Sequence, residues 1–420
     1  MATGRVSDLC QHRTTCRLCG GSALTRVLAL KASPPANAFV AADQLDTPQQ
    51  TFPLDVFFCQ HCHHVQLLDV VDAKVLFENY VYVSATSPVF VKHFEDYAQF
   101  VIDRYNPPAG SLVFDIGSND GTLLRAFKNS GHDVLGVDPA KDIAAAASAD
   151  GIETISGFFS GPMAEEIRAE RGSAAVITAN NVFAHIDDLG GVLNGIHLLL
   201  DDDGVFVFEV SYLLDMFENT LFDMIYHEHL AYHTVEPLIA FMAAHNMELI
   251  DVQRVPSHGG SLRAVCQTTA GTRPVDGSVA GLVGLEKSLG LDKAATYQDF
   301  GNRIDALGAE LSALLQDLKT QGRSIAAFGA PAKATTLMYH FGIGADLIDF
   351  IVDDSPLKQG LYSPGMHIPV LPSSAIYDRK PDNIVILAWN FAAPIMAKHK
   401  QYTDAGGRFI VPLPRLEIFR

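Results

Sequence analysis

Short apolar runs alternate with helix-like segments in the middle of the chain. A helix is predicted from residue 122 to 128, directly after a glycine-containing turn at 117–121. Continuous apolar runs of strand length predict strands at residues 111–116, 133–137, 175–179 and 205–210. Strands that alternate with helices are typical of a parallel, doubly wound α/β sheet.

The last third of the chain repeats this plan. A long amphipathic helix is expected at about 300–320, and a glycine turn at 329–336 opens a second helix. Strands are predicted at residues 323–328, 347–352 and 383–388. Two nucleotide-type units in one chain suggest two nucleotide-like ligands, although one unit could instead be a scaffold. Between the N-terminal region and these units, residues 65–105 are predicted to be mainly helical with an aromatic loop at 79–82.

Four of the six cysteines form two CxxC pairs, at Cys16/Cys19 and Cys59/Cys62. Paired CxxC turns can supply four thiolates to a tetrahedral zinc ion. We therefore expect a structural zinc site with no open position, which holds the fold and does no chemistry. Four unrelated buried cysteines are the alternative, and a neighbouring histidine could replace one ligand. The residues between the pairs must fold as an insertion.

Composition limits the possible partners. A chain of 420 residues is long enough for two to four domains, and its 48% apolar content can build real cores. A formal charge of −18 argues against nucleic acid as a partner. No apolar run approaches the roughly 20 residues that span a bilayer, and the N-terminus lacks a signal-peptide core. We expect no membrane partner and a cytoplasmic protein.

The turn after the first central strand differs from a dinucleotide fingerprint. Pyrophosphate-binding turns follow GxGxxG, whereas this one carries acids and an asparagine. Acids suit a ligand with amino and sulfonium groups, and Asp138 at the end of the next strand can accept ribose hydroxyls. We therefore favour S-adenosylmethionine over NAD. The predicted cofactor residues are Asp115, Gly117, Asn119, Asp120, Gly121, Asp138 and Asn180.

Residues 226–233 contain three histidines, one glutamate and two tyrosines. These side chains exchange protons near neutral pH, so the cluster favours general acid–base chemistry. His229 and His233 lie at i and i+4, as zinc-peptidase ligands do, but the required glutamate does not follow His229. A surface helix with scattered histidines is the remaining alternative.

Seven motifs occur in the order of a known family. They are the paired CxxC, VFDIGSNDGTLL, NNVFAHIDDL, YHEHLAYH, HGGSLR, FGAPAKATTL and ILAWNF. Together they resemble the nucleotide-sugar C-methyltransferases, such as the C-3′-methyltransferases of deoxysugar biosynthesis. The resemblance implies a small N-terminal zinc-binding module (1–75), then an S-adenosylmethionine domain (76–298) and a nucleotide-sugar-binding domain (299–420). Both larger domains would be Rossmann-like, doubly wound α/β units.

The resemblance also implies roles for individual residues. Such enzymes methylate a carbon next to the ketone of a 4-keto-deoxysugar carried on TDP or a related nucleotide, through an enolate. His229 would be the base, Glu228 would orient it, and Tyr226 would contact the sugar. His185 would stabilise the enolate and Tyr80 would reach the substrate. Predicted contacts to the nucleotide sugar are His258, Gly259, Arg263, Gly329, Lys333, Lys358 and Trp389.

Several alternatives stay open at this stage. Two nucleotide folds would also suit an NAD-dependent nucleotide-sugar oxidoreductase or epimerase. A zinc-ribbon interaction protein with a degenerate core, or a methyltransferase acting on oxygen or nitrogen, would share many of these motifs. The sequence does not decide the nucleotide, the sugar, the methylated carbon (C-3′ or C-5′), or whether His227 and His233 are functional. It is silent on oligomeric state, with a monomer as the working expectation.

Overall fold

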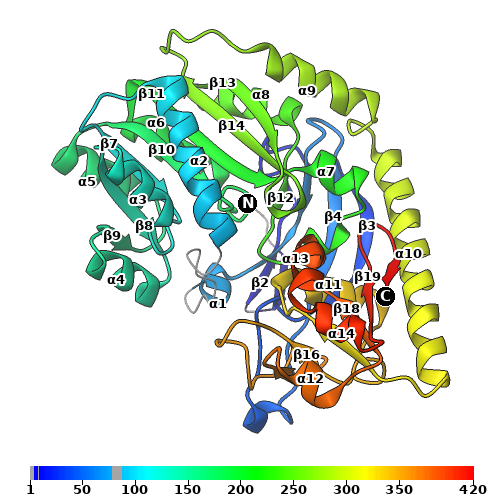
Figure 1. Ribbon diagram of the computed structural model, residues 1–420. Helices are drawn as coiled ribbons and strands as arrows, with labels where there is room; N and C mark the ends of the chain where they lie inside the picture. The colour runs from blue at the N-terminus through cyan, green and yellow to red at the C-terminus, as the bar shows by residue number, and fades with distance from the viewer. Residues whose placement is uncertain (1–3, 8, 78–87) are drawn as a thin grey trace.

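The computed structural model describes residues 4–7, 9–77 and 88–420 (Figure 1). Its N-terminal module is built from short antiparallel strands. One sheet contains β1 (Gly4–Ser7), β2 (Cys10–His12) and β6 (Asp69–Val71); a second contains β3 (Leu24–Ser33), β4 (Phe52–Cys59) and β5 (Val65–Leu67). Alternate residues of β4 point into the core, as a half-buried strand requires.

The helical prediction for residues 65–105 is only partly correct. The stretch begins with β5 and β6, and only then come helix α1 (Ala73–Phe77) and helix α2 (Pro88–Tyr105). Val65 and Leu67 lie in β5 because this strand pairs with β4 on one side and with β12 on the other. That pairing is a tertiary effect which outweighs the local pattern.

The central domain is a seven-stranded sheet in the order β13-β14-β11-β10-β7-β8-β9. Its strands are β7 (Leu112–Ile116), β8 (Asp133–Asp138), β9 (Thr154–Ser156), β10 (Ala174–Asn180), β11 (Leu200–Ser211), β13 (Met247–Val255) and β14 (Ser261–Thr268). Five strands are parallel, and β13 and β14 form an antiparallel hairpin at one end. The four predicted central strands are therefore confirmed, and the hairpin is an addition.

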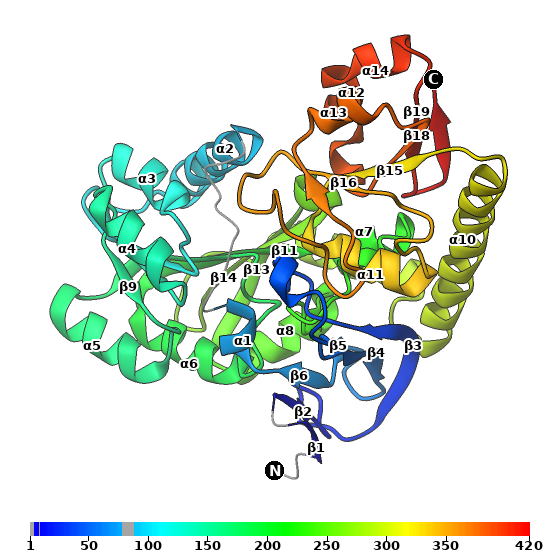
Figure 2. The same cartoon turned by 90° about the horizontal axis from the view of Figure 1, so that it is seen from below.

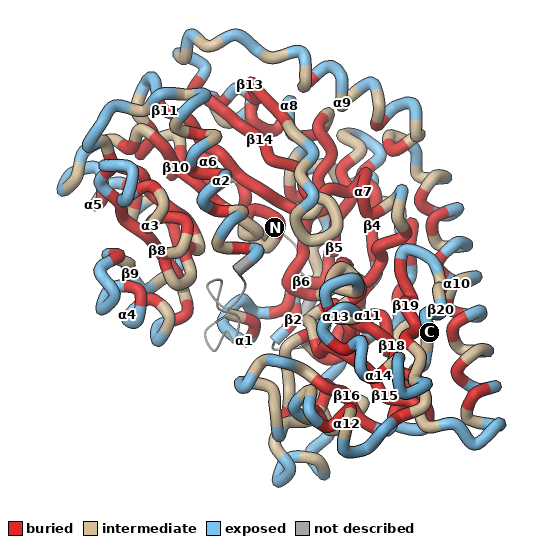
Figure 3. Tube along the Cα trace, viewed as in Figure 1, coloured by how far each residue is buried: buried red, intermediate tan, exposed pale blue. Residues whose placement is uncertain are grey.

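Helices cover both faces of this sheet, and each face has its own apolar core (Figure 3). The helices are α3 (Thr122–Asn129), α4 (Lys141–Ala149), α5 (Gly161–Arg171), α6 (Leu189–Leu199), α8 (Val235–Ala244) and α9 (Gly277–Ser288). Helices α2 and α3 pack on one face, around Phe94 and Phe127. Apolar residues of α6 and α8, such as Ile196 and Phe241, lie in the other core. Short segments α7 (Leu213–Glu218), η3 (Phe222–Met224) and β12 (Ala231–Tyr232) follow β11.

The C-terminal domain is a six-stranded sheet in the order β17-β16-β15-β18-β19-β20, parallel except for β20. Its strands are β15 (Ile325–Phe328), β16 (Ile351–Val352), β17 (Val370–Leu371), β18 (Asn383–Ile386), β19 (Arg408–Val411) and β20 (Glu417–Phe419). Its helices are α11 (Ala332–Phe341), α12 (Ala375–Arg379), α13 (Ala392–Lys398) and α14 (Lys400–Asp404). Helix α10 (Ala294–Thr320) leads into this domain along the outside of the molecule (Figure 1).

The three parts of the chain are joined through one antiparallel sheet. Strand β12 of the central region pairs with β5 of the N-terminal module, giving the order β12-β5-β4-β3. Helices α10 and α11 pack on β3 at the other edge (Figure 2). The predicted fold class is confirmed: a small N-terminal module precedes two Rossmann-like α/β units. Within the described residues, no helix has the length and apolar character needed to cross a membrane.

Candidate active site

A single large cavity, of about 1060 Å³, lies where the three parts meet. Its walls come from the carboxyl ends of β7, β8 and β10, from the segment 224–229, and from the turns after β15 and β16. The carboxyl ends of parallel strands are where α/β folds bind ligands. The predicted residues that line it are Asp115, Gly117, Asn119, Asp138, Asn180, His185, Tyr226, His229, His258, Lys333 and Lys358.

Asp138, at the end of β8, accepts one backbone hydrogen bond from the turn after β7 and one from its own loop. One carboxylate oxygen accepts from the Asn119 N–H at 2.9 Å and the other from the Ala140 N–H at 2.8 Å. Gly117 has φ +71°, and a Cβ there would lie 2.4 Å from a methyl group of Val182. Only glycine fits both constraints, so the backbone of this turn forms the cavity floor.

Asp120 and Gly121 build the turn and do not line the cavity. The Asp120 carboxylate accepts hydrogen bonds from the backbone N–H and hydroxyl of Thr122, at the start of α3. Gly121 has φ +75°, and a Cβ there would approach Ile152 to 2.7 Å. In this structure the two residues shape the loop, and their contact with a cofactor stays a prediction.

Asn180 carries the clearest sign of an absent ligand. Its side-chain nitrogen and oxygen are both buried at the cavity, and neither has a hydrogen-bond partner of normal geometry among the described residues. Buried amides are nearly always bonded, so this one fits the amino and carboxylate groups of an amino-acid-bearing ligand. Nearby, Asp115 accepts from the Thr178 hydroxyl at 2.6 Å, and burial raises its pKa to about 7. A cationic ligand would favour its ionised form, so this donor set fits S-adenosylmethionine.

His229 has the geometry of a neutral base. Its Nδ1 lies 2.7 Å from the backbone carbonyl of Met224. A carbonyl only accepts, so Nδ1 carries the proton and Nε2 keeps a free lone pair. Burial lowers the pKa of His229 to about 4, so the ring is neutral at pH 7. The Tyr226 ring lies 4.0 Å from it, centroid to centroid.

His185 stacks on this base. The two ring centroids are 4.9 Å apart, and Phe77 stacks on the other face of His185 at 5.6 Å. Burial and the neighbouring His229 hold the pKa of His185 well below its usual range. Its Nε2 is buried at the cavity without a hydrogen-bond partner among the described residues. The two histidines to which the resemblance gives active-site roles therefore lie side by side.

The role of Glu228 in orienting His229 stays a prediction, and the structure gives this residue a further contact. The bond that orients His229 goes to the Met224 carbonyl, whereas the buried Glu228 carboxylate accepts from the Asn37 amide at 2.9 Å. Glu228 thus ties the N-terminal module to the segment that carries the base. Asn37 and Met224 were missed by sequence reasoning, and a backbone carbonyl leaves no sequence signal. Tyr80 lies outside the described residues.

His227 and His233 do not line the cavity. His227 Nε2 lies 3.2 Å from the Phe52 carbonyl, and His233 is fully buried with its ring stacked on Phe183 at 5.7 Å. The segment from 228 to 233 is a turn followed by strand β12. Because it is not a helix, the i and i+4 spacing brings no pair of metal ligands onto one face. Both histidines are packing residues, and the peptidase alternative fails.

Lys333 and Lys358 contribute the cationic part of the wall. Lys333 Nζ donates to Asn390 Oδ1 at 2.7 Å and lies 3.3 Å above the Trp389 ring, and burial lowers its pKa to about 8. Lys358 Nζ donates to the Ala330 carbonyl at 2.8 Å. Gly329 (φ +89°) makes the turn beneath them and does not itself line the cavity.

Three other predicted substrate contacts, Trp389, Gly259 and Arg263, do not line the cavity. The Trp389 indole donates to Asp223 at 2.6 Å, and Gly259 packs against the Trp389 ring. Arg263 is paired at 2.6 Å with the buried Glu209, so its charge is already neutralised. Only His258 from this loop lines the cavity.

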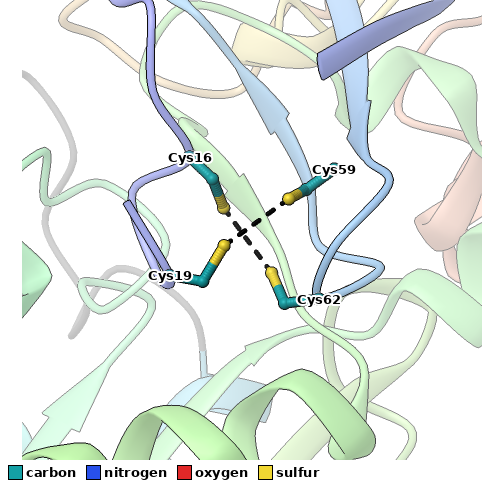
Figure 4. Close-up of side chains that lie close together, drawn as sticks. All are labelled: Cys16, Cys19, Cys59 and Cys62. Atoms are coloured by element: carbon teal, nitrogen blue, oxygen red, sulfur yellow. Dashed lines mark hydrogen bonds between the residues drawn. The ribbon is translucent and has the colours of Figure 1, made fainter. Parts of the chain in front are cut away.

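The four predicted metal ligands converge on one point (Figure 4). Their sulfur atoms all lie within 4.8 Å of one another, and the Cys16–Cys62 and Cys19–Cys59 pairs are 3.6 Å apart. Tetrahedral zinc with Zn–S bonds of about 2.3 Å requires sulfurs about 3.8 Å apart. The set fits zinc and leaves no position for a substrate.

Comparisons with known proteins agree with this architecture. Three family models match, described as "Putative zinc binding domain" (residues 16–77), "Methyltransferase domain" (91–252) and "C-methyltransferase C-terminal domain" (256–414). Two remote structural likenesses are the PH0226 protein of Pyrococcus horikoshii and a magnesium protoporphyrin IX methyltransferase of Synechocystis with bound SAM. The first has a TM-score of 0.37, 14% identity, and covers 44% of this chain and 94% of that one. The second has a TM-score of 0.32, 10% identity, and covers 42% and 78%.

A curated relative matches along nearly the whole length. It is the C-methyltransferase NovU of Streptomyces niveus, 34% identical over 409 residues, with 97% of each chain covered. None of these comparisons supports the oxidoreductase or epimerase alternative. With its zinc-ligand set, its methyltransferase fold and this relative, the chain belongs to the C-methyltransferase family.

Proposed function

We propose that this enzyme transfers the methyl group of S-adenosylmethionine to a carbon next to the ketone of a nucleotide-linked 4-keto-deoxysugar, with C-3′ as the position. The observation that carries the proposal is the neutral His229, whose free Nε2 belongs to a cavity shared by both α/β units. A sugar carbon becomes a nucleophile only after a base removes its α-proton. The relative NovU is named a C-methyltransferase, which supports carbon as the acceptor.

In this mechanism His229 Nε2 takes the α-proton, and the C–H electron pair moves to the ketone oxygen as an enolate. His185 and Tyr226, whose rings pack against His229, hold the imidazole in place and can donate toward the enolate oxygen. S-adenosylmethionine, when bound, supplies an electrophilic methyl carbon on its sulfonium. The enolate carbon forms the new C–C bond as the S–CH₃ bond breaks, and the ketone is restored.

The two ends of the cavity suit the two ligands. Asp115, Asn119 and Asn180 form the end we assign to the donor. Lys333 and Lys358, beside the start of α11, form the end we assign to the nucleotide diphosphate. An ammonium and a helix N-terminus both stabilise phosphate charge.

The test is mass spectrometry of the enzyme incubated with S-adenosylmethionine and a panel of nucleotide 4-keto-6-deoxysugars. The expected product is one methylene heavier, with the methyl group on carbon by NMR. Wash-out of deuterium from the α-carbon should occur and should require His229. Methyl transfer to oxygen or nitrogen without wash-out would contradict the enolate. Failure to bind S-adenosylmethionine would remove the whole proposal.

A further inference from the structure

Arg17 lies between two of the zinc ligands, inside the first CxxC turn, and its side chain is bonded to segments outside that turn. The side chain is fully buried. Its Nη1 lies 3.0 Å from the Leu67 carbonyl and 2.7 Å from the Leu230 carbonyl, and its Nη2 lies 3.2 Å from the Asp187 carboxylate. A fully buried arginine is costly unless it is bonded, and this one is bonded to three separate segments.

Two of these segments carry the catalytic histidines. Leu230 directly follows His229, and Asp187 lies two residues beyond His185. The segments are also bonded to each other, because the Leu230 and Ala231 N–H groups both donate to the Ala184 carbonyl, at 2.8 and 3.1 Å. Arg17 is therefore bonded to both segments, and the stacked rings of His185 and His229 join the same two segments.

We propose that Arg17 is a positioning residue which sets the stacking of His185 on His229 and so makes the zinc turn a support of the base. Zinc fixes the backbone on both sides of Arg17, through Cys16 and Cys19. The planar guanidinium is then bonded to both loops, through the Leu230 carbonyl and the Asp187 carboxylate. The catalytic consequence rests on the proposed function, whereas the histidine geometry does not.

Loss of Arg17 should affect the alignment of the two histidine rings with the substrate. A misplacement of about 1 Å in a reacting group can lower a rate about 100-fold without preventing binding. The hydrogen bonds described for Arg17 go to Gln66, Leu67, Leu230 and Asp187, and none of them goes to the turn after β7 or to Lys333. Its loss should therefore disturb proton transfer and leave donor binding intact. Loss of a residue with only a structural role would instead lower zinc content, donor affinity and kcat together.

The chain offers a matched control. Arg13 also reaches the Asp187 carboxylate, at 2.8 Å, but its side chain is 21% exposed and its described bonds do not include Leu230. We would compare Arg17→Met, Arg17→Lys and Arg13→Gln as zinc-loaded proteins. The first measurements are zinc content, S-adenosylmethionine affinity by calorimetry, and kcat and KM for the sugar substrate. The NMR signals of the histidine rings are also recorded, and the His229→Gln variant assigns the His229 signal.

The expected result is an Arg17→Met protein with full zinc and unchanged donor affinity, but with kcat lower by about 10- to 100-fold. The His185 and His229 ring signals should move, Arg17→Lys should recover part of kcat, and Arg13→Gln should resemble the parent. The proposal is overturned if Arg17→Met keeps the parent's histidine signals and kcat. It is also overturned if kcat falls only in proportion to lost zinc or lost fold.

A second variant covers the case in which Arg17→Met does not fold. Asp187→Asn leaves Arg17 and its bond to Leu230 in place, and the Asp187 side chain is 40% exposed, so the fold should survive. It should move the His185 signal more than the His229 signal. Unmoved histidine signals would contradict the proposal. If no sugar is methylated even by the parent, the proposed function fails, while the NMR signals still decide the role of Arg17.

Discussion

The burial of His229 determines the pH at which its base is lost. Burial disfavours the charged imidazolium and lowers the pKa of His229 to about 4. Protonation would remove the lone pair, so this group should cause a fall in kcat/KM only as the pH drops toward about 4. The prediction is checked by a pH profile of kcat/KM for the sugar substrate. An acid limb centred near pH 6.5 would show that the base is an exposed histidine instead.

Replacing His229 separates chemistry from binding. His229→Ala should lower kcat by about 10²- to 10⁴-fold, the usual contribution of a general base, and leave S-adenosylmethionine affinity within about twofold. Calorimetry and initial rates check this. His227→Gln is the matched control, because His227 is two residues away and outside the cavity wall. Equal loss of activity in both variants would mean that the segment, and not the base, was damaged.

At the residue scale, the sequence identifies side chains whose chemical type is unusual. His185, His229, Asp138 and the four zinc ligands could be found this way. Contacts made by backbone atoms could not, and the Met224 carbonyl that sets the tautomer of His229 is one of these. Arg263 shows the opposite problem, since it was predicted to contact the nucleotide sugar but its charge is already neutralised by a buried partner, Glu209.

At the scale of elements, the turn after β7 is the most sensitive part of the donor site. Gly117→Ala should weaken S-adenosylmethionine binding at least about tenfold, because a Cβ would lie 2.4 Å from Val182, which also lines the cavity. Such an overlap must displace backbone or side chain, at a cost of about 1–3 kcal/mol. Calorimetric titration and chemical unfolding check both effects.

Gly110→Ala is the control for that variant. Gly110 has a similar φ of +74°, but a Cβ there meets nothing within 4 Å. It should share the backbone strain of about 1 kcal/mol and leave donor binding unchanged. If the two variants bind the donor equally well, the steric argument for Gly117 is wrong.

Element prediction succeeded where the pattern was local. The buried strands of both α/β units are apolar runs bounded by turns, so β7, β8, β10 and β18 appear close to their predicted places. β5 and β12 were not predicted because they are two or three residues long and depend on pairing with strands that are distant in the sequence or in another module. The antiparallel hairpin of β13 and β14 was not predicted. The motif HGGSLR (258–263) indicated a loop, although β14 begins inside it.

At the scale of the whole molecule, the zinc site supports the cavity from outside. Removing zinc with a chelator should release the first CxxC turn, and with it the pairing of β5 with β12 and the segment 226–233. Hydrogen–deuterium exchange should therefore rise in residues 226–233 as well as around the cysteines. Exchange in β8 and β9, on the far side of the central sheet, should stay nearly unchanged. An increase confined to the N-terminal module would refute this coupling.

The antiparallel sheet that joins the N-terminal module to the central region also has a consequence for synthesis on the ribosome. The partner of β5 is β12, whose residues emerge only after most of the central sheet has been made. Until then β5 pairs only with β4 and its other edge is open, and an open strand edge is a site for aggregation. Early zinc capture by the four cysteines would keep the nascent module compact during this interval. Yield in a cell should therefore depend on metal supply during translation, and not only on the stability of the finished protein.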